Sequence, residues 1–196
     1  KMLFRYPGGK AKLSKFLISK LERDITTNSI YYEPFFGGGA IGIELLKRGI
    51  LQKNIVINDF DDGIASIWNC VISHPQELKE KILQFEPSVE SFFEFKNFLL
   101  NTNGKKSSIL EVGFKKLALH QMSFSGLGVK AGGPIGGLNQ SSKYGVGCRW
   151  NSKHLVKQID WLHKLLVEKT NMCFSQDFSE VLTNVKKEDI LYIDPP

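Results

Sequence analysis

The chain has 196 residues, of which 42% are hydrophobic and 23% charged. This composition is typical of a globular domain with a buried core. Its 26 Lys and Arg residues outnumber its 20 Asp and Glu residues, giving a net charge of +6, which favours an anionic partner such as nucleic acid.

Several classes of protein are excluded at this level. No apolar run reaches the roughly 18 residues of a transmembrane helix, and the N-terminal residues lack the apolar segment of a signal peptide. We therefore expect a cytoplasmic protein with no membrane partner. The cysteines Cys70, Cys148 and Cys173 are widely separated and form no Cys/His cluster, so we predict neither a metal site nor a disulfide framework.

The first third of the chain alternates between helical and strand-forming segments. Glycines at 37–39 separate the first strand from its helix, and Asp59 follows the second strand. This alternation is typical of a parallel sheet covered by helices, so an α/β fold is predicted. In chain order, the pattern predicts a helix over 12–23, a strand over 30–35, a helix over 41–47, a strand over 54–58 and a helix over 62–72.

The middle of the chain breaks this alternation. Residues 75–121 carry only helical patterns, 123–150 are rich in glycine and polar residues, and 152–168 again form an amphipathic helix. Strands are expected at 172–175 and 190–194, with a short helix at 178–182 between them. We predict a catalytic core of 1–73 and 169–196, and a mainly helical subdomain of 74–168 inserted into it.

A glycine turn and an acidic residue form the first chemical motif. Gly37 and Gly39 allow a ligand close to the backbone, and the helix that follows presents free N–H groups. Asp59 comes about 20 residues later, where a carboxylate accepts hydrogen bonds from ribose hydroxyls. A ligand-free tight turn and a helix N-cap are the alternatives. The pair predicts a nucleoside cofactor and does not separate NAD from S-adenosylmethionine.

Asp194-Pro195-Pro196 directly follows the last apolar strand. Prolines there end strand pairing and hold a rigid loop at the sheet edge where α/β folds bind ligands. The Asp194 carboxylate and the Pro195 carbonyl could each accept an N–H of an adenine amine, which exposes its lone pair to a methyl donor. An ordinary turn at the strand end is the alternative.

In this order the motifs resemble those of the Dam-like DNA adenine-N6 methyltransferases, over nearly the whole chain. The resemblance implies a Rossmann-like core that binds S-adenosylmethionine and methylates adenine in duplex DNA. It implies catalytic roles for Asp194, Pro195 and Pro196. By the same resemblance the cofactor contacts Tyr6, Lys10, Glu33, Phe35, Gly37, Gly39, Asp59, Asp177, Phe178 and Asp194.

The sequence departs from the family pattern at two places. Tyr6 stands where the family often has Trp. The family's catalytic motif also ends in an aromatic residue that stacks on the flipped adenine, whereas this sequence stops at Pro196, before the later strands of such a sheet. We expect the chain to be a fragment of a longer enzyme. If it ended here, cofactor binding would be weakened and catalysis nearly lost.

The inserted region is the predicted DNA-recognition element, since cations contact phosphates and amides or hydroxyls reach base edges. A solvated flexible loop is the alternative.

The resemblance also allows a cognate restriction endonuclease as partner. An N4-cytosine or RNA methyltransferase, a nicotinamide dehydrogenase and a truncated non-catalytic DNA-binding relative remain alternatives. The candidate DNA contacts are Ser125, Lys130, Asn139, Lys143, Arg149 and Asn151.

Overall fold

The computed structural model describes residues 2–6, 8, 10, 13–52, 54–101 and 107–195, with the backbone alone at 171–174. Its centre is a four-stranded sheet in the order β3-β2-β1-β4, in which all neighbouring strands are parallel. Tyr31 lies opposite both Ile55 and Ile190, so the central strand is paired on both sides. The strands are β1 (Tyr31–Glu33), β2 (Ile55–Asn58), β3 (Thr170–Phe174) and β4 (Ile190–Leu191).

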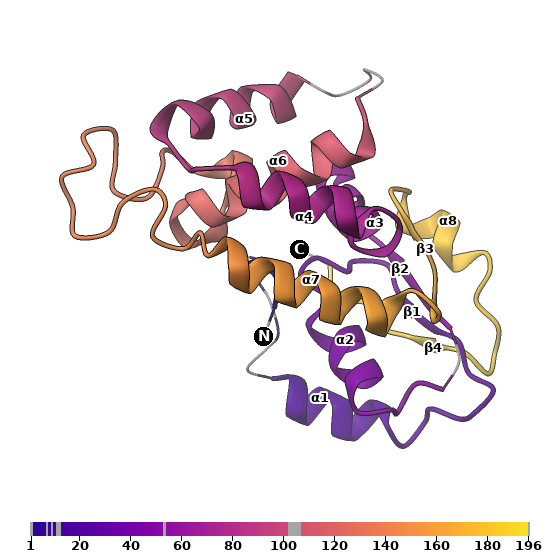
Figure 1. Cartoon of the computed structure of the whole chain (residues 1–196). Coiled ribbons are helices and arrows are strands. Elements are labelled where there is room, and N and C mark those ends of the chain that lie inside the picture. The colour runs from indigo at the N-terminus through magenta and orange to yellow at the C-terminus, as the bar shows by residue number, and fades with distance from the viewer. Residues whose placement is uncertain are drawn as a thin grey trace.

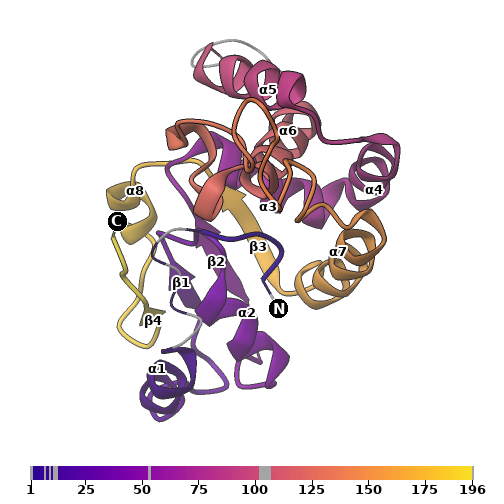
Figure 2. The same ribbon diagram turned by 90° about the vertical axis from the view of Figure 1, so that its left-hand side faces the viewer.

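Alternate residues of the strands point to opposite faces of the sheet, as the pleat requires. Tyr31, Ile55 and Ile57 are buried in the main core, which the helices share. Tyr32 and Val56 point the other way and pack with Val181 of helix α8 (Phe178–Leu182). Figure 2 shows α8 and α7 on opposite sides of the sheet. Both faces are therefore covered, as expected for a parallel sheet.

Three helices alternate with the first two strands along the chain, in the order α1, β1, α2, β2, α3. Helix α1 spans Ser14–Leu21, α2 spans Ala40–Lys47 and α3 spans Asp62–Ser73. Gly39 precedes α2 with a φ of 68°, a left-handed conformation that favours glycine. The Asp61 carboxylate caps α3 by accepting the N–H groups of Gly63 and Ile64. The glycine and the acid thus fix the two turns at one end of the sheet.

The remaining helices are α4 (Pro75–Gln84), α5 (Val89–Asn101), α6 (Ile109–Met122) and α7 (Ser152–Leu166). Helices α4, α5 and α6 form a layer above one end of the sheet, and α7 runs between α4 and α2 (Figure 1). Helix α6 packs closely on α3, and Gly113 of α6 allows this approach. A Cβ atom at Gly113 would lie only 2.7 Å from the Ser66 carbonyl of α3. The predicted insertion is thus in direct contact with the predicted core, and its limits stay a prediction.

A long loop joins α6 to α7 and projects from one side of the molecule (orange in Figure 1). It begins with two 3-10 turns, η1 (Phe124–Gly126) and η2 (Gly128–Lys130). The side chain of Gln140 closes the projecting part, donating to the Ile135 carbonyl and accepting the Val146 N–H. Beyond its two 3-10 turns, the loop is therefore ordered by side-chain hydrogen bonds, although it forms no further helix or named strand in the described residues.

The predicted mixed α/β fold with a parallel sheet is confirmed. Two strands were predicted too long: β1 spans Tyr31–Glu33 instead of 30–35, and β4 ends at Leu191 instead of Asp194. Tyr192 still donates its N–H to the Tyr32 carbonyl, but Pro195 has no N–H with which to continue the pairing. Among the residues that the structure describes, no helix is both long and apolar enough to span a membrane.

Candidate active site

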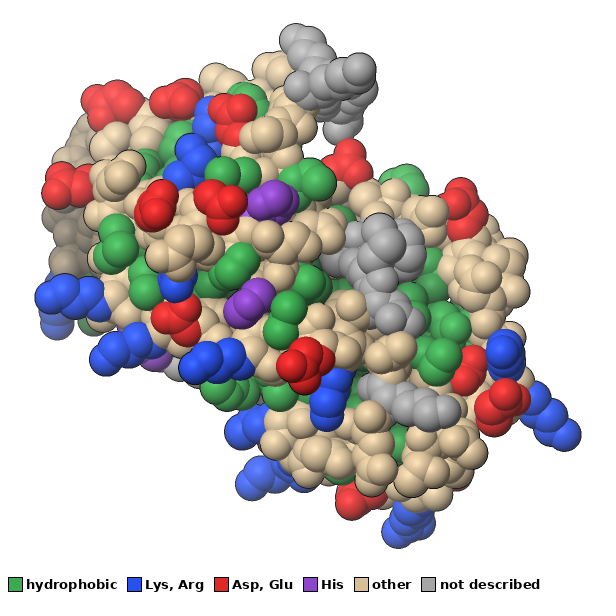
Figure 3. Space-filling view, turned by 45° about the vertical axis from the view of Figure 1, so that its right-hand side comes forward, with side chains coloured by type: hydrophobic (Ala, Val, Ile, Leu, Met, Phe, Trp, Pro, Cys, Tyr) green, Lys and Arg blue, Asp and Glu red, His purple; other side chains and the backbone are tan. Residues whose placement is uncertain are grey.

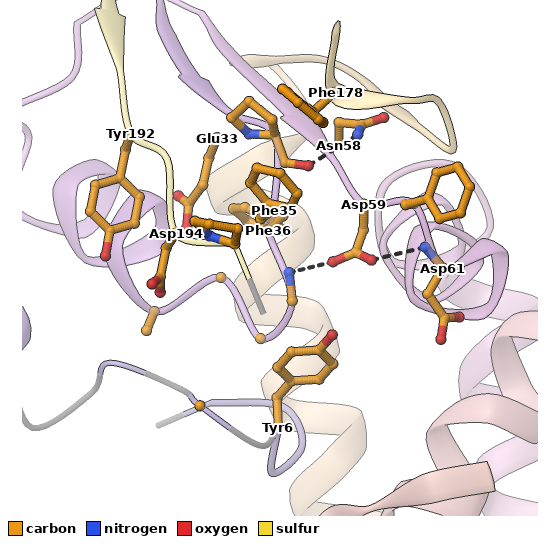
Figure 4. A pocket seen from close by; sticks show the side chains of 18 of the residues that line it. Tyr6, Glu33, Phe35, Phe36, Asn58, Asp59, Asp61, Phe178, Tyr192 and Asp194 are labelled. Atoms are coloured by element: carbon orange, nitrogen blue, oxygen red, sulfur yellow. Dashed lines mark hydrogen bonds between the residues drawn. The ribbon is translucent and has the colours of Figure 1, made fainter. Parts of the chain in front are cut away.

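A pocket of about 580 Å³ opens where the carboxyl ends of β1, β2 and β4 meet the N-terminal segment (Figure 4). The parallel strands bring their ends to one edge, so residues far apart in the sequence meet there. All the residues predicted to contact the cofactor line this pocket, and so do Pro195 and Lys130. Pro196, the third predicted catalytic residue, lies outside the described residues.

Asp59 fixes the glycine turn. Its Oδ2 accepts the Gly37 N–H at 2.8 Å and its Oδ1 accepts the Asp61 N–H at 3.0 Å, as the dashed lines in Figure 4 show. The Gly37 carbonyl in turn accepts the indole N–H of Trp68 at 2.8 Å. Burial raises the pKa of Asp59, while the two backbone hydrogen bonds lower it. Each carboxylate oxygen keeps a lone pair for a further donor.

Tyr6 packs against the glycine turn on the side away from Asp59 (Figure 4). A Cβ at Gly37 would lie 2.8 Å from Cε1 of Tyr6, and the φ of Gly37 is 49°. Both facts require glycine at this position. Burial, followed by the nearby Asp59 and Asp61, raises the pKa of Tyr6 to about 12, so the phenol stays neutral.

Glu33 is a buried carboxyl group at the end of β1, with a side chain directed toward the region of Asp194 in Figure 4. Its Oε2 accepts the Tyr31 hydroxyl at 2.9 Å and the Gly42 N–H at 3.0 Å. Burial raises the pKa of Glu33 to about 8, although both hydrogen bonds oppose the shift. The group therefore joins the strand end to helix α2 and is largely protonated at neutral pH.

The predicted catalytic carboxylate is paired with a lysine. Lys10 Nζ lies 2.8 Å from Asp194 Oδ1, and both side chains remain about one-third exposed. Lys10 also donates to the Gly8 carbonyl at 3.2 Å. The pair joins the N-terminal motif to the last strand end, and the Asp194 carboxylate keeps lone pairs for a further donor.

Two aromatic rings lie on the β2 and α8 side of the pocket. The rings of Phe35 and Phe178 are 5.4 Å apart at an interplanar angle of 36°, and Phe178 is 42% exposed. Asp177 caps α8 through the Ser179 N–H, and hydrogen bonds from the Ser179 hydroxyl and N–H lower the pKa of Asp177. An exposed aromatic edge beside a pocket offers a stacking surface for a planar ring.

The predicted DNA contacts are divided between three places. Lys130 lines the pocket already described, and Arg149 and Asn151 line a second one. Ser125 is exposed with a φ of 52°, in turn η1. Asn139 and Lys143 are exposed on the projecting loop. Asn151 also caps α7 by accepting the His154 N–H, a structural role that leaves its amide N–H₂ group available.

The second pocket, of about 560 Å³, lies between the N-terminal segment and α7. Its described lining holds Arg5, Arg149 and His154 and no carboxylate. Burial and the nearby Arg5 charge lower the pKa of Arg149. Two guanidinium groups brought together without an acidic partner favour an anionic ligand. Met2 lines both pockets, so the N-terminal segment separates them.

Arg5 was not among the predicted site residues, although it directly precedes Tyr6 in the N-terminal motif. A charged pair behind the first pocket was not predicted either: Lys116 Nζ lies 2.6 Å from Asp61 Oδ2. Lys116 is almost fully buried. Burial raises the pKa of Asp61, but the Lys116 charge and the capping hydrogen bonds outweigh burial, so the pKa of Asp61 is lowered overall. The sequence hinted at this pair only through a lysine that interrupts an apolar helical face.

One turn after Lys116, His120 is also buried. Its Nδ1 lies 2.7 Å from the Gly126 carbonyl, and its ring is 5.2 Å from that of Phe4. Burial lowers the pKa of His120 to about 4, so the imidazole is neutral at physiological pH. In the part of the chain that the structure describes, no group of three His, Cys, Asp or Glu side chains could hold a metal ion.

A glycine turn, an acid and an Asp-Pro loop thus meet at the carboxyl edge of a parallel sheet, which is where the α/β class of proteins binds its ligands. Residues 6–196 match the D12 class N6 adenine-specific DNA methyltransferase family, and the chain belongs to that family.

Two relatives are each 25% identical to the chain. The type II methyltransferase M1.LlaDCHI of Lactococcus lactis subsp. cremoris aligns with 85% of the chain, which spans 56% of that relative's length. The type II methyltransferase M.MjaIII of Methanocaldococcus jannaschii aligns with all of the chain, over 68% of its own length.

Proposed function

We propose that this protein transfers a methyl group from S-adenosylmethionine to the N6 amine of adenine in duplex DNA. One observation carries the proposal: the motifs at Tyr6, Gly37, Asp59, Phe178 and Asp194 line a single pocket. We further propose that the sheet and its helices are a Rossmann-like methyltransferase core, and that residues 74–168 are an inserted recognition subdomain. The strand order and the parallel pairing support this core.

The residues of the pocket fit the cofactor by their chemistry. Asp59 has free lone pairs for the ribose hydroxyls, and the rings of Phe35 and Phe178 offer a stacking surface for the adenine. Tyr6, Gly37 and Gly39 form the adjoining wall. When bound, S-adenosylmethionine supplies an electrophilic sulfonium methyl group.

Asp194 and Pro195 orient the amine that is methylated. The Asp194 carboxylate and the Pro195 carbonyl each accept one N–H, which turns the nitrogen lone pair away from both acceptors and toward the methyl donor. Lys10 holds Asp194 Oδ1 at 2.8 Å before the amine arrives. Lys10 therefore positions this carboxylate, which keeps lone pairs for the amine N–H.

The second pocket is proposed as the DNA groove. Arg5 and Arg149 attract the phosphates or the guanine edges of the duplex, because guanidinium groups bind both. Met2 borders both pockets, so this groove adjoins the pocket that holds Asp194 and would receive a flipped base. A cognate restriction endonuclease is a proposed partner, supported by the names of the type II relatives.

The test is transfer of radiolabel from S-adenosylmethionine to duplex DNA, followed by digestion to nucleosides. Label in N6-methyladenine is the expected result. Label in N4-methylcytosine, or in RNA when RNA is offered, would contradict the acceptor. Cofactor binding without transfer to any of these acceptors would contradict the activity and indicate a non-catalytic relative.

A further inference from the structure

Helix α7 presents an unusual outward face. Lys153, Lys157, Trp161 and Lys164 are spaced by four, four and three residues, so they lie within one arc of the helix. All four are exposed, with Trp161 39% exposed. The opposite arc, which carries Leu155, Ile159, Leu162 and Leu166, is buried in the core.

Within the described part of the chain, the lysines of this face have no acidic partner in an ion pair. None of the ion pairs between described residues includes Lys153, Lys157 or Lys164. Asp160, the acidic residue of the helix, lies at the edge of the same arc, four residues before Lys164, and its carboxylate is held by Lys79 of α4 at 2.6 Å. Figure 3 shows Lys and Arg side chains in a row along the lower-left part of the molecule, while Asp and Glu predominate above it.

The face is continuous with the second pocket. The first turns of α7 line that pocket through Asn151, His154 and Gln158, and Lys153 and Lys157 stand beside these residues on the same helix. A duplex seated in the pocket between Arg5 and Arg149 therefore has this row of lysines beside its flank. From Lys153 to Lys164 the helix rises about 16 Å, which is the axial length of roughly five base pairs.

We propose that Lys153, Lys157, Trp161 and Lys164, here called the α7 stripe, bind the sugar-phosphate backbone of duplex DNA outside the recognition site. The inference rests on the proposed function, and adds a second contact that reads no sequence. The lysines neutralise phosphates and release counterions, and the indole of Trp161 packs on the sugars. The stripe thereby holds flanking DNA while the pockets engage the target.

Binding of two duplexes tests the stripe, one of about 12 base pairs limited to the target and one of about 30 with the same centre. The triple variant Lys153→Ala/Lys157→Ala/Lys164→Ala is compared with Lys15→Ala/Lys186→Ala/Lys187→Ala. The control removes the same charge from exposed positions on α1 and before β4. Both sets lie at the surface, so each is expected to fold.

For the stripe variant, affinity for the long duplex should fall about 10-fold to 100-fold, and the slope of log affinity against log salt should fall by about 2 to 3. Its affinity for the short duplex and the behaviour of the control should stay near wild type. Equal losses on both duplexes, or a stripe variant that matches the control, would overturn the inference. Single-stranded RNA is offered as a third ligand. A loss of binding to RNA alone would overturn the inference and assign the stripe to RNA.

Trp161 gives a second readout that needs no charge change. Trp68 is fully buried and Trp150 is half-buried with its N–H bonded to the Phe85 carbonyl, so Trp161 is the most exposed indole. The long duplex should protect it from acrylamide quenching and the short one should not, with Trp161→Phe as the blank. Equal quenching with either duplex would overturn the stripe. Wild-type protein that neither binds nor methylates any duplex would instead overturn the proposed function.

Discussion

At the scale of single residues, the role proposed for Asp194 separates catalysis from cofactor binding. The change Asp194→Ala removes the proposed acceptor for the target amine and frees Lys10, but leaves Asp59 and the glycine turn in place. Methyl transfer should fall at least about 100-fold, the scale of losing one aligned transition-state contact. Single-turnover transfer and calorimetric cofactor binding measure the two effects separately. Asp24→Asn, an exposed acid elsewhere, is the control, and normal turnover by the Asp194 variant would contradict the assignment.

Gly37 is a second residue that its surroundings restrict, because they leave little room for a side chain. The change Gly37→Ala places a methyl group 2.8 Å from the Tyr6 ring at a φ of 49°, so Tyr6 or the turn must shift. We expect a loss of about 1–3 kcal/mol in the free energy of unfolding and weaker cofactor binding. Gly132→Ala is the matched control, because a Cβ there meets nothing within 4 Å. Equal stability of the two variants in urea would refute the close approach.

At the scale of elements, the Asp61–Lys116 pair joins the start of α3 to α6. Lys116 is 6% exposed and Asp61 is 42% exposed, so the two ends of the pair are not equivalent. Asp61→Ala strands a buried ammonium group and uncaps α3, which should cost about 3–5 kcal/mol. Lys116→Met leaves the partly exposed carboxylate capping the helix and should cost less.

Urea denaturation of both variants measures this asymmetry. Lys79→Met serves as the comparison, because Lys79 is less buried than Lys116, with 16% of its side chain exposed against 6%. The more exposed a pair is, the closer its contribution comes to the surface limit of about 1 kcal/mol. If Lys116→Met proved as damaging as Asp61→Ala, the burial of the ammonium group would not be the cause. Cofactor affinity should follow the same order, since Asp61 donates its N–H to Asp59.

At the scale of the whole molecule, His120 makes stability depend on acid pH. The pKa of His120 is lowered to about 4 by burial, against an ordinary value of 6.5. Between these values the unfolded chain binds a proton that the folded chain does not. The free energy of unfolding should therefore fall as the pH falls from 6.5 to 4, by about 3 kcal/mol from this residue.

Thermal unfolding across this pH range measures the effect. The variant His120→Gln keeps a polar group for the Gly126 carbonyl but does not titrate. It should be less stable than wild type at pH 7 and should lose less stability on acidification. A variant with an unchanged pH slope would show that other groups control the acid range.

The sequence alone determined the order of the elements and most of the first pocket. The glycine turn, Asp59 and Asp194 each follow a strand, and parallel strands place their carboxyl ends at one edge. Local chemistry and strand direction therefore suffice to bring these residues together. The end of β4 was misplaced by three residues, because the tertiary pairing with β1 decides where a strand stops.

The tertiary structure alone decided the contacts between segments that no local pattern relates. The pairs Lys10–Asp194 and Lys116–Asp61 join residues 184 and 55 positions apart, and Arg5 meets Arg149 across the second pocket. Periodicity reports which face of a helix is apolar but not which charge lies opposite a buried lysine. Those choices depend on how α6 packs on α3 and how the N-terminal segment crosses the sheet edge, and only packing in three dimensions sets both.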